Sequence, residues 1–341
     1  MTARRAGGKL AKIMLQDKFG REIHDLRISV TDRCNFSCVY CKSADPKNYF
    51  PHRDLPTWDE FLRVARVLAG QGIRKVRVTG GEPLLRDGIV NFIGDLHRIR
   101  GLTDIAITTK GYLLPEMAAV LAATGPVRVT VSLDSTDPAK FARITRTPRS
   151  CEKVMAGVEA ALAAGLKPVK VNIVLVRGFN DDEIVEFARL ARRQDLIVRF
   201  IEFMPLDADH AWSRGVVITA KEIVETVNAV FPLVEIPRRS PSETALRYQF
   251  ADGQGELGII APVSIPFCGQ CSRLRLTADG KIRTCLFSLR EHDVRHLVRN
   301  GATDDDLAQF FTRVVHQKEP GHRINEPDFV QPKRTMVYIG G

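Results

Sequence analysis

The stretch KVRVTGGEPLLRDGIVNFIGDLHRIRGLTDIAITT (residues 75–109) contains one complete strand–helix–strand unit. KVRVT and DIAITT are short runs rich in β-branched residues, and both predict strands. The apolar spacing of IVNFIGDLHRI between them predicts a helix. A helix between two strands predicts that the strands are parallel and joined by a right-handed crossover.

The same alternation extends in both directions along the chain. Strands are predicted at residues 25–30, 75–79, 104–109, 127–133, 169–176 and 196–203. Helices are predicted at residues 57–70, 89–99, 114–123, 151–164, 181–193 and 219–230. Six such units predict an α/β fold, either a doubly wound sheet or a partial barrel. Thr57 and Glu60 form a capping-box pattern that marks the start of the first helix.

The pattern changes after about residue 230. Short strand-like runs follow, separated by Gly, Pro and Asp, and then two helices are predicted within residues 293–299 and 304–315. GQGELG (residues 253–258) spells a dinucleotide-binding motif, but it lies between two strand-like runs and so predicts a hairpin turn. We therefore predict a flexible segment at 1–20, a barrel at 21–230 and a C-terminal region at 231–341.

Composition limits the possible partners. The 341 residues carry a net charge of +10, which suits an anionic partner such as nucleic acid or a polyphosphate, and equally suits a plain solvated surface. The sequence contains no run of about 18 apolar residues, so no membrane span is predicted. The basic first 20 residues lack the apolar core of a secretion signal, so we expect a cytoplasmic protein with reduced thiols.

Six of the seven cysteines form two groups of three. The first trio is Cys34, Cys38 and Cys41, and the second trio is Cys268, Cys271 and Cys285. Structural metal sites usually have four protein ligands, so each trio leaves a position open. Zinc is the alternative, with His52 completing the first trio or His292 the second. The remaining cysteine, Cys151, has helical surroundings and is predicted to be a small buried residue.

Polar and unusual residues follow the predicted strands. They are the first trio, GGEP (residues 80–83), Thr108, Ser132, Asp134 and Met204. Active sites of parallel α/β barrels form at these carboxyl ends, so a site is predicted there.

Basic residues also lie within the strands. Lys75 and Arg77 are two positions apart and therefore share one face, as do Arg273 and Arg275. The set on the barrel strands is Arg27, Lys75, Arg77, Lys170 and Arg199. Buried cations need partners. Two explanations stay open: Glu82, Asp134 and Glu202 neutralise them, or they bind a polyanion.

These motifs resemble a known family. CNFSCVYC after the first strand and GGEP after the second are similar to radical S-adenosylmethionine (SAM) enzymes. DLRISVTDRCNFSCVYC, KVRVTGGEPLLR, VRFIEFMPL, FCGQCSRLRLTADGKIRTCLF and the terminal YIGG together resemble the GTP 3′,8-cyclases of molybdenum cofactor biosynthesis. The resemblance covers residues 19–341.

The resemblance implies an incomplete six-unit TIM-type (β/α) barrel with a C-terminal α+β layer covering the open side. It implies a lyase that converts GTP to (8S)-3′,8-cyclo-7,8-dihydroguanosine 5′-triphosphate with a radical derived from SAM, so no side chain is expected to be catalytic. The implied cofactors are SAM and two 4Fe-4S clusters, one on each trio.

The resemblance also implies roles for individual residues. Those that contact SAM are Tyr40, Gly81, Ser132 and Met204. Those that bind GTP are Arg27, Lys75, Arg77, Thr108, Lys170, Arg199, Arg273, Leu274 and Arg275. The tail residues Gly340 and Gly341 are implied to reach into the site. The sequence departs from the family pattern at Lys110 and at Lys42-Ser43, which follow the third strand and the first trio.

The implied partners are GTP, an electron donor such as flavodoxin or ferredoxin, and the cyclic pyranopterin monophosphate synthase that receives the product. A homodimer is compatible with the family; nucleic acid and membrane are not expected as partners. One alternative is a radical SAM enzyme that modifies a peptide and carries an auxiliary cluster. Another is a zinc protein that binds nucleic acid.

Overall fold

The computed structural model describes residues 14–44, 49–193 and 195–340, and one mixed sheet of 12 strands forms the centre of this part. The strand order is β12-β11-β10-β1-β2-β3-β4-β5-β6-β9-β8-β7. The middle six strands are parallel and are β1 (Asp25–Ser29), β2 (Lys75–Thr79), β3 (Asp104–Thr109), β4 (Val127–Ser132), β5 (Val169–Leu175) and β6 (Leu196–Glu202). All six match the predicted strands to within one residue.

The C-terminal region extends this sheet at both edges. At one edge are β9 (Glu256–Ile260), β8 (Ala245–Phe250) and β7 (Leu233–Ile236), and β9 pairs in parallel with β6. At the other edge are β10 (Arg273–Leu276), β11 (Lys281–Arg283) and β12 (His292–Asp293), and β10 pairs in parallel with β1. The predicted α/β class with an incomplete barrel is confirmed. The C-terminal strands share the barrel's own sheet, and the predicted hairpin at GQGELG joins β8 to β9.

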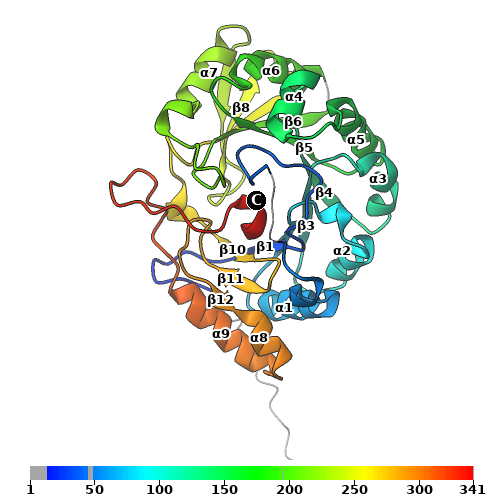
Figure 1. The fold of residues 1–341 in the computed structure, drawn as a ribbon, viewed down its shortest axis with the longest axis vertical. Coiled ribbons are helices and arrows are strands. Elements are labelled where there is room, and N and C mark those ends of the chain that lie inside the picture. Colours follow the sequence, from blue (N-terminus) through cyan, green and yellow to red (C-terminus); the bar gives the residue numbers. More distant parts are fainter. Residues whose placement is uncertain (1–13, 45–48, 194, 341) are drawn as a thin grey trace, which may run out of the picture.

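Helices surround the outside of the sheet (Figure 1). They are α1 (Trp58–Gly70), α2 (Ile89–His97), α3 (Leu114–Ala122), α4 (Pro138–Thr145), α5 (Cys151–Ala163), α6 (Ile184–Arg193) and α7 (Ala220–Asn228). The Thr57–Glu60 capping box at the start of α1 is present as predicted. α8 (Val294–Arg299) and α9 (Asp304–His316) follow beside α1, whereas the short α10 (Met336–Ile339) lies in the middle of the ring of strands (Figure 1). None of the helices in the described ranges is long and apolar enough to cross a membrane.

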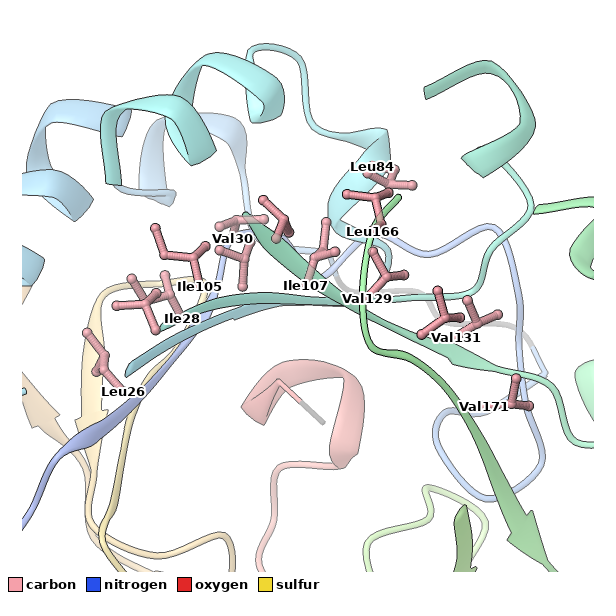
Figure 2. Packing of buried hydrophobic residues seen from close by; sticks show 14 of the residues in the cluster. Leu26, Ile28, Val30, Leu84, Ile105, Ile107, Val129, Val131, Leu166 and Val171 are labelled. Carbon is pink, nitrogen blue, oxygen red and sulfur yellow. The ribbon is translucent and has the colours of Figure 1, made fainter. Parts of the chain in front are cut away.

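The two faces of the central strands have opposite chemistry. Leu26, Ile28 and Ile105 point toward the outer helices and are almost fully buried, while α10 lies on the other side of the strands (Figure 2). Side chains alternate along a strand, so Arg27 and Arg77 point to the inner side. The hydrophobic core therefore lies between sheet and helices, and the inner face is left for polar side chains.

The helix α4 was not predicted. Its start carries a recognisable signal, since Asp137 caps it by accepting a hydrogen bond from the Lys140 backbone N–H at 2.8 Å, and Pro138 occupies the first helical position. Its last residues accept backbone hydrogen bonds from Ser37 (2.8 Å, to Thr145) and Val39 (2.9 Å, to Ile144). The missed helix therefore supports the loop of the first trio.

The N-terminal segment differs from the prediction of a flexible stretch at 1–20. Residues 1–13 lie outside the described residues. Leu15 is 1% exposed, and Gln16 forms an isolated bridge with Glu22. Leu15 and Asp17 are buried, and Leu15 contributes to the hydrophobic core, whereas residues 16 and 18–20 are exposed.

Candidate functional site

A cavity of about 560 Å³ lies inside the ring of strands and extends from their amino ends, at Asp25, Lys75 and Asp104, to the loops at their carboxyl ends. All six cysteines of the two trios line it. It is also lined by residues of all six barrel strands and of the C-terminal region, including Met336 and Val337 of α10. The structure therefore brings together two cysteine groups that are more than 200 positions apart in the sequence.

The first trio lies on the loop after β1. This loop is fixed to α4 by the backbone bonds described above and by Phe36, whose ring packs edge-on against Phe141 at 5.6 Å. Burial raises the pKa of the Cys38 thiol to about 12 and that of Cys41 to about 11, although the positive charge of Lys110 opposes the shift. Free thiols would therefore stay protonated at neutral pH, and a bound metal would have to displace their protons.

The residues implied to contact SAM line the cavity as well. Tyr40 donates a hydrogen bond from its hydroxyl to Asp134 at 2.6 Å, and Ser132 and Met204 lie on the cavity wall. Gly81 lies so close to the loop of the first trio that an added Cβ would be 2.2 Å from the carbonyl oxygen of Arg33. Only glycine permits this approach, so the GGEP segment and the cysteine loop are packed together.

The second trio comes from two chain segments. Cys268 and Cys271 lie in and after a single 3-10 turn (Cys268–Gln270), and Cys285 follows β11. Burial acts to raise the pKa of Cys271, but the positive charges of Arg273 and Lys318 outweigh it and lower the pKa to about 6. This thiol would be largely ionised at neutral pH, as a metal ligand must be.

The geometry bears on the zinc alternative. Within residues 14–44, 49–193 and 195–340, no group of three or more His, Cys, Asp or Glu side chains is arranged to hold one metal ion. Ligands of one zinc ion all lie about 2.1–2.3 Å from it, whereas the thiolates of a four-iron cluster each bind a different iron. His52 and His292 do not line the cavity; the histidine that does is His322.

The strand cations form a continuous surface across the cavity. Arg275, Arg27 and Arg77 lie in direct register on β10, β1 and β2. Arg77 donates to the hydroxyls of Thr108 (3.1 Å) and Thr130 (3.2 Å). The whole cationic surface comprises Arg27, Lys75, Arg77, Lys170, Arg199, Arg273 and Arg275, and every member lines the cavity.

The three acids that could have neutralised these cations bind elsewhere. Glu82 accepts from the Thr109 hydroxyl (2.8 Å) and the backbone N–H of Leu84 (2.9 Å), and Asp134 accepts from Tyr40. Glu202 accepts from backbone N–H groups of Ala220, Val263 and Ser264. Among the described residues, the one ion pair of a cationic-surface residue joins Lys75 to Asp25 at 3.9 Å.

The electrostatics follow from this arrangement. Burial and the neighbouring charges of Arg77, Arg273 and Arg199 lower the pKa of Arg27 to about 9. Burial and the charges of Arg199 and Arg128 lower the pKa of Lys170 to about 7. Cations held this close together, with one ion pair among them in the described residues, form a binding surface for a polyanion such as a triphosphate.

Leu274 and the tail complete the set of implied residues. The side chain of Leu274 is fully buried in the hydrophobic core, on the face of β10 opposite to Arg273 and Arg275, so only its backbone can face the cavity. Arg275 donates from Nη1 to the carbonyl oxygen of Gly340 at 2.8 Å, which brings the tail to the inner face of the sheet. Gly341 lies outside the described residues.

Sequence patterns missed several residues near the site. His322 lines the cavity, with both ring nitrogens buried and its ring edge-on to Phe287 at 5.4 Å. Arg21 donates to the carbonyl oxygens of Cys268 (2.8 Å) and Pro320 (2.9 Å), and Lys318 is buried beside the second trio. No local motif marks these positions because their partners are distant in the sequence. Cys151 is buried in α5, as predicted.

Comparison with known proteins agrees with this site. The family model described as Radical SAM superfamily matches residues 28–191, and the one described as Molybdenum Cofactor Synthesis C matches residues 196–324. A GTP 3′,8-cyclase of Moorella thermoacetica is 43% identical over 96% of this chain and 100% of its own length. One of Mycolicibacterium smegmatis is 45% identical over 96% of this chain and 92% of its own.

Among solved structures, Streptococcus suis SuiB bound to S-adenosylmethionine has a TM-score of 0.61 at 13% identity, covering 94% of this chain and 79% of that chain. This likeness concerns the fold. The full-length matches at more than 40% identity show that the chain belongs to the GTP 3′,8-cyclase family of radical SAM enzymes.

Proposed function

We propose that this protein converts GTP to (8S)-3′,8-cyclo-7,8-dihydroguanosine 5′-triphosphate, the first step of molybdenum cofactor biosynthesis. The observation that carries the proposal is the single cavity that two cysteine trios share with a largely unpaired cationic surface. Relatives named GTP 3′,8-cyclase that match nearly the whole chain support the same substrate.

The first trio fits a 4Fe-4S cluster that binds SAM. Its three thiols are close in sequence, line the cavity and leave one iron without a protein ligand. When bound and reduced, the cluster and SAM supply a 5′-deoxyadenosyl radical, the reagent that removes hydrogen from the GTP ribose. Tyr40, Gly81, Ser132 and Met204 would hold SAM beside this cluster, and Asp134 would fix the Tyr40 hydroxyl.

The cationic surface would hold the triphosphate. Arginine forks bind phosphate oxygens in pairs, and the register of Arg275, Arg27 and Arg77 offers three forks side by side. Thr108 is fixed by Arg77 and would add a hydroxyl contact. Fixing the triphosphate sets the position of the ribose, and small displacements of a reacting atom are costly in rate.

The second trio would hold a second 4Fe-4S cluster, and its three thiols would leave one iron available to the guanine base. The trio lies on the C-terminal part of the cavity wall, together with Arg273 and Phe267, whose ring lies 5.1 Å from the Arg273 guanidinium carbon. The protein would thereby bind GTP at both ends.

The proposal also includes the protein's partners and location. The electron donor would be a flavodoxin or ferredoxin, and the product would pass to cyclic pyranopterin monophosphate synthase. The protein would be a cytoplasmic homodimer.

The decisive experiment is anaerobic incubation of the iron-reconstituted protein with GTP, SAM and dithionite. We expect 5′-deoxyadenosine and a cyclised nucleotide in comparable amounts, detected by chromatography and mass spectrometry. Formation of 5′-deoxyadenosine while GTP stays unchanged would refute the substrate. Iron analysis should give about eight irons per chain, the content of two four-iron clusters; one or two zinc ions without iron would instead support a zinc protein.

A substitution on the cavity wall tests the nucleotide site separately. Arg273→Ala should weaken GTP binding by about tenfold or more, since a charge-assisted bond to phosphate contributes about 1.5–3 kcal/mol. Uncoupled cleavage of SAM should persist because the first trio is untouched. Equilibrium binding of GTP and the yield of 5′-deoxyadenosine are the measurements, and unchanged GTP affinity would contradict the assigned role.

A further inference from the structure

Lys318 is a buried lysine that joins the two chain segments of the second trio. It is 2% exposed, and its ammonium donates to the carbonyl oxygens of Arg273, at 2.9 Å, and of Thr284. Arg273 lies two residues after Cys271, and Thr284 directly precedes Cys285. One ammonium group thus connects the backbone beside two of the three thiols.

The charge of Lys318 has no carboxylate partner within ion-pair distance in the described part of the chain. The adjacent carboxylate, that of Glu319, accepts from the Thr284 hydroxyl at 2.7 Å. Carbonyl oxygens satisfy the N–H groups of a lysine but do not neutralise it, and an unpaired buried charge is costly. The ammonium of Lys318 is therefore hydrogen-bonded but not ion-paired.

Arg21 provides a contrast at the same place. It is also buried, and it donates to the carbonyl oxygen of Cys268 at 2.8 Å. Its charge, however, is neutralised by Asp17 at 2.6 Å. Lys318 and Arg21 are thus both buried beside the second trio, but only Arg21 is paired with a carboxylate. Arg273 and Arg275 also lie beside this trio without an ion pair among the described residues, but they line the cavity, whereas Lys318 does not.

The sulfur atoms are the anions that remain. Lys318 does not line the cavity, so it faces the trio from behind and is not positioned to touch a bound nucleotide. Its ammonium bonds the carbonyl oxygen of the residue two after Cys271 and that of the residue directly before Cys285, so its charge lies close to both ends of the trio. A cluster held by three thiolates concentrates negative charge at this point.

We propose that Lys318 is the counter-charge of the second cluster: it stabilises the thiolates that hold the cluster and raises its reduction potential. The inference rests on the proposed second 4Fe-4S cluster and adds a positioning residue that acts from behind it. Reduction adds one negative charge to a cluster, and a fixed positive charge nearby stabilises the reduced form more than the oxidised form.

The test uses full-length protein in which Cys34, Cys38 and Cys41 are replaced by alanine, so that only the second cluster contributes. Lys318→Gln removes the charge and keeps a hydrogen-bond donor, while Lys318→Met removes both. Both variants should lower the midpoint potential, measured by anaerobic potentiometric titration followed by electron paramagnetic resonance. A Lys318→Gln variant with the parent potential would overturn the proposal.

The matched control is the double variant Asp17→Asn/Arg21→Gln, which removes a buried ion pair beside the same trio without changing net charge. The midpoint potential of the second cluster should shift less from the parent value in this control than in Lys318→Gln. An equal shift would show that local packing is responsible and would overturn the proposal.

Iron content separates the remaining outcomes. If Lys318→Gln cannot hold the cluster but Lys318→Arg can, the charge is required and the proposal stands. If Lys318→Arg also loses the iron, the shape of the lysine matters and its charge does not, which overturns the proposal. A parent protein without about four irons would instead refute the second cluster itself, together with any counter-charge.

Discussion

At the scale of single residues, Lys170 shows how the nucleotide site lowers the stability of the nucleotide-free protein. Its ammonium is buried on β5, and burial together with the charges of Arg199 and Arg128 lowers its pKa from 10.5 to about 7. The folded protein therefore binds fewer protons at this position than the unfolded chain between about pH 7 and 10.5. Stability of the nucleotide-free protein should rise with pH across this window.

Lys170→Met should remove that pH dependence. The variant should be more stable than the wild type at pH 7 by about 1–3 kcal/mol, because a buried, unpaired charge is lost. Its affinity for GTP should fall by about tenfold or more. Chemical denaturation with and without GTP measures both effects.

The control for this prediction is Lys153→Met on α5, where the lysine is partly exposed and paired with Glu116 at 2.7 Å. A partly exposed pair contributes little, so this variant should change neither quantity by much. Lower stability of Lys170→Met at pH 7 would contradict the view that Lys170, which forms no ion pair among the described residues, destabilises the nucleotide-free protein.

At the scale of elements, the short helix α10 brings the chain end to the inner face of the sheet. Gly340 follows it with φ of +82°, a conformation that favours glycine, and an added Cβ would lie 2.7 Å from the Cβ of Ser29 on β1. Arg275 on β10 holds the carbonyl oxygen of the same residue. The position of the tail thus depends on two strands and on a residue without a side chain.

Gly340→Ala should displace the tail from this position. We expect the yield of cyclised nucleotide to fall by about tenfold or more, since misplacement near a reacting centre is costly, while cleavage of SAM persists. Gly301→Ala is the matched control, because Gly301 has φ of +80° but no atom within 4 Å of an added Cβ. That control should lose about 1 kcal/mol of stability and keep its activity; a fully active Gly340→Ala would show that the tail is not positioned by this contact.

At the scale of the whole molecule, the barrel and the C-terminal region form one sheet. β9 pairs with the last barrel strand, β6, and β10 pairs with the first, β1. A barrel ending at residue 230 would expose both edge strands, and unpaired edges favour aggregation. We therefore expect that the predicted boundary at 231 separates regions of sequence pattern and not two independent folding units.

A fragment comprising residues 1–230 should consequently aggregate or unfold without cooperativity. The full-length protein should unfold in one cooperative transition because its sheet is continuous. Circular dichroism and denaturant unfolding of both proteins check the prediction. A soluble fragment with a sharp transition of its own would show that the barrel does not need the C-terminal strands.

Much of the fold was predictable because it depends on local patterns. The period-2 alternation of KVRVT predicted that Lys75 and Arg77 share one face, and the structure places both on the cavity wall and buries Val76 and Val78. The cysteine spacing likewise predicted two incomplete ligand sets. α4 was missed although Asp137 and Pro138 signal its start, so that omission was avoidable.

The sequence by itself determined the parallel strand–helix units, the two trios and the sharing of one strand face by neighbouring cations, because these follow from spacing along one segment. Tertiary structure alone decided that β10 pairs with β1, that Glu82, Asp134 and Glu202 do not form ion pairs with the strand cations, and that Lys318 lies beside the second trio. The physical reason is that a counter-charge or a strand partner is set by proximity in space, and residues such as Arg273 and Lys318 meet only after the chain has folded.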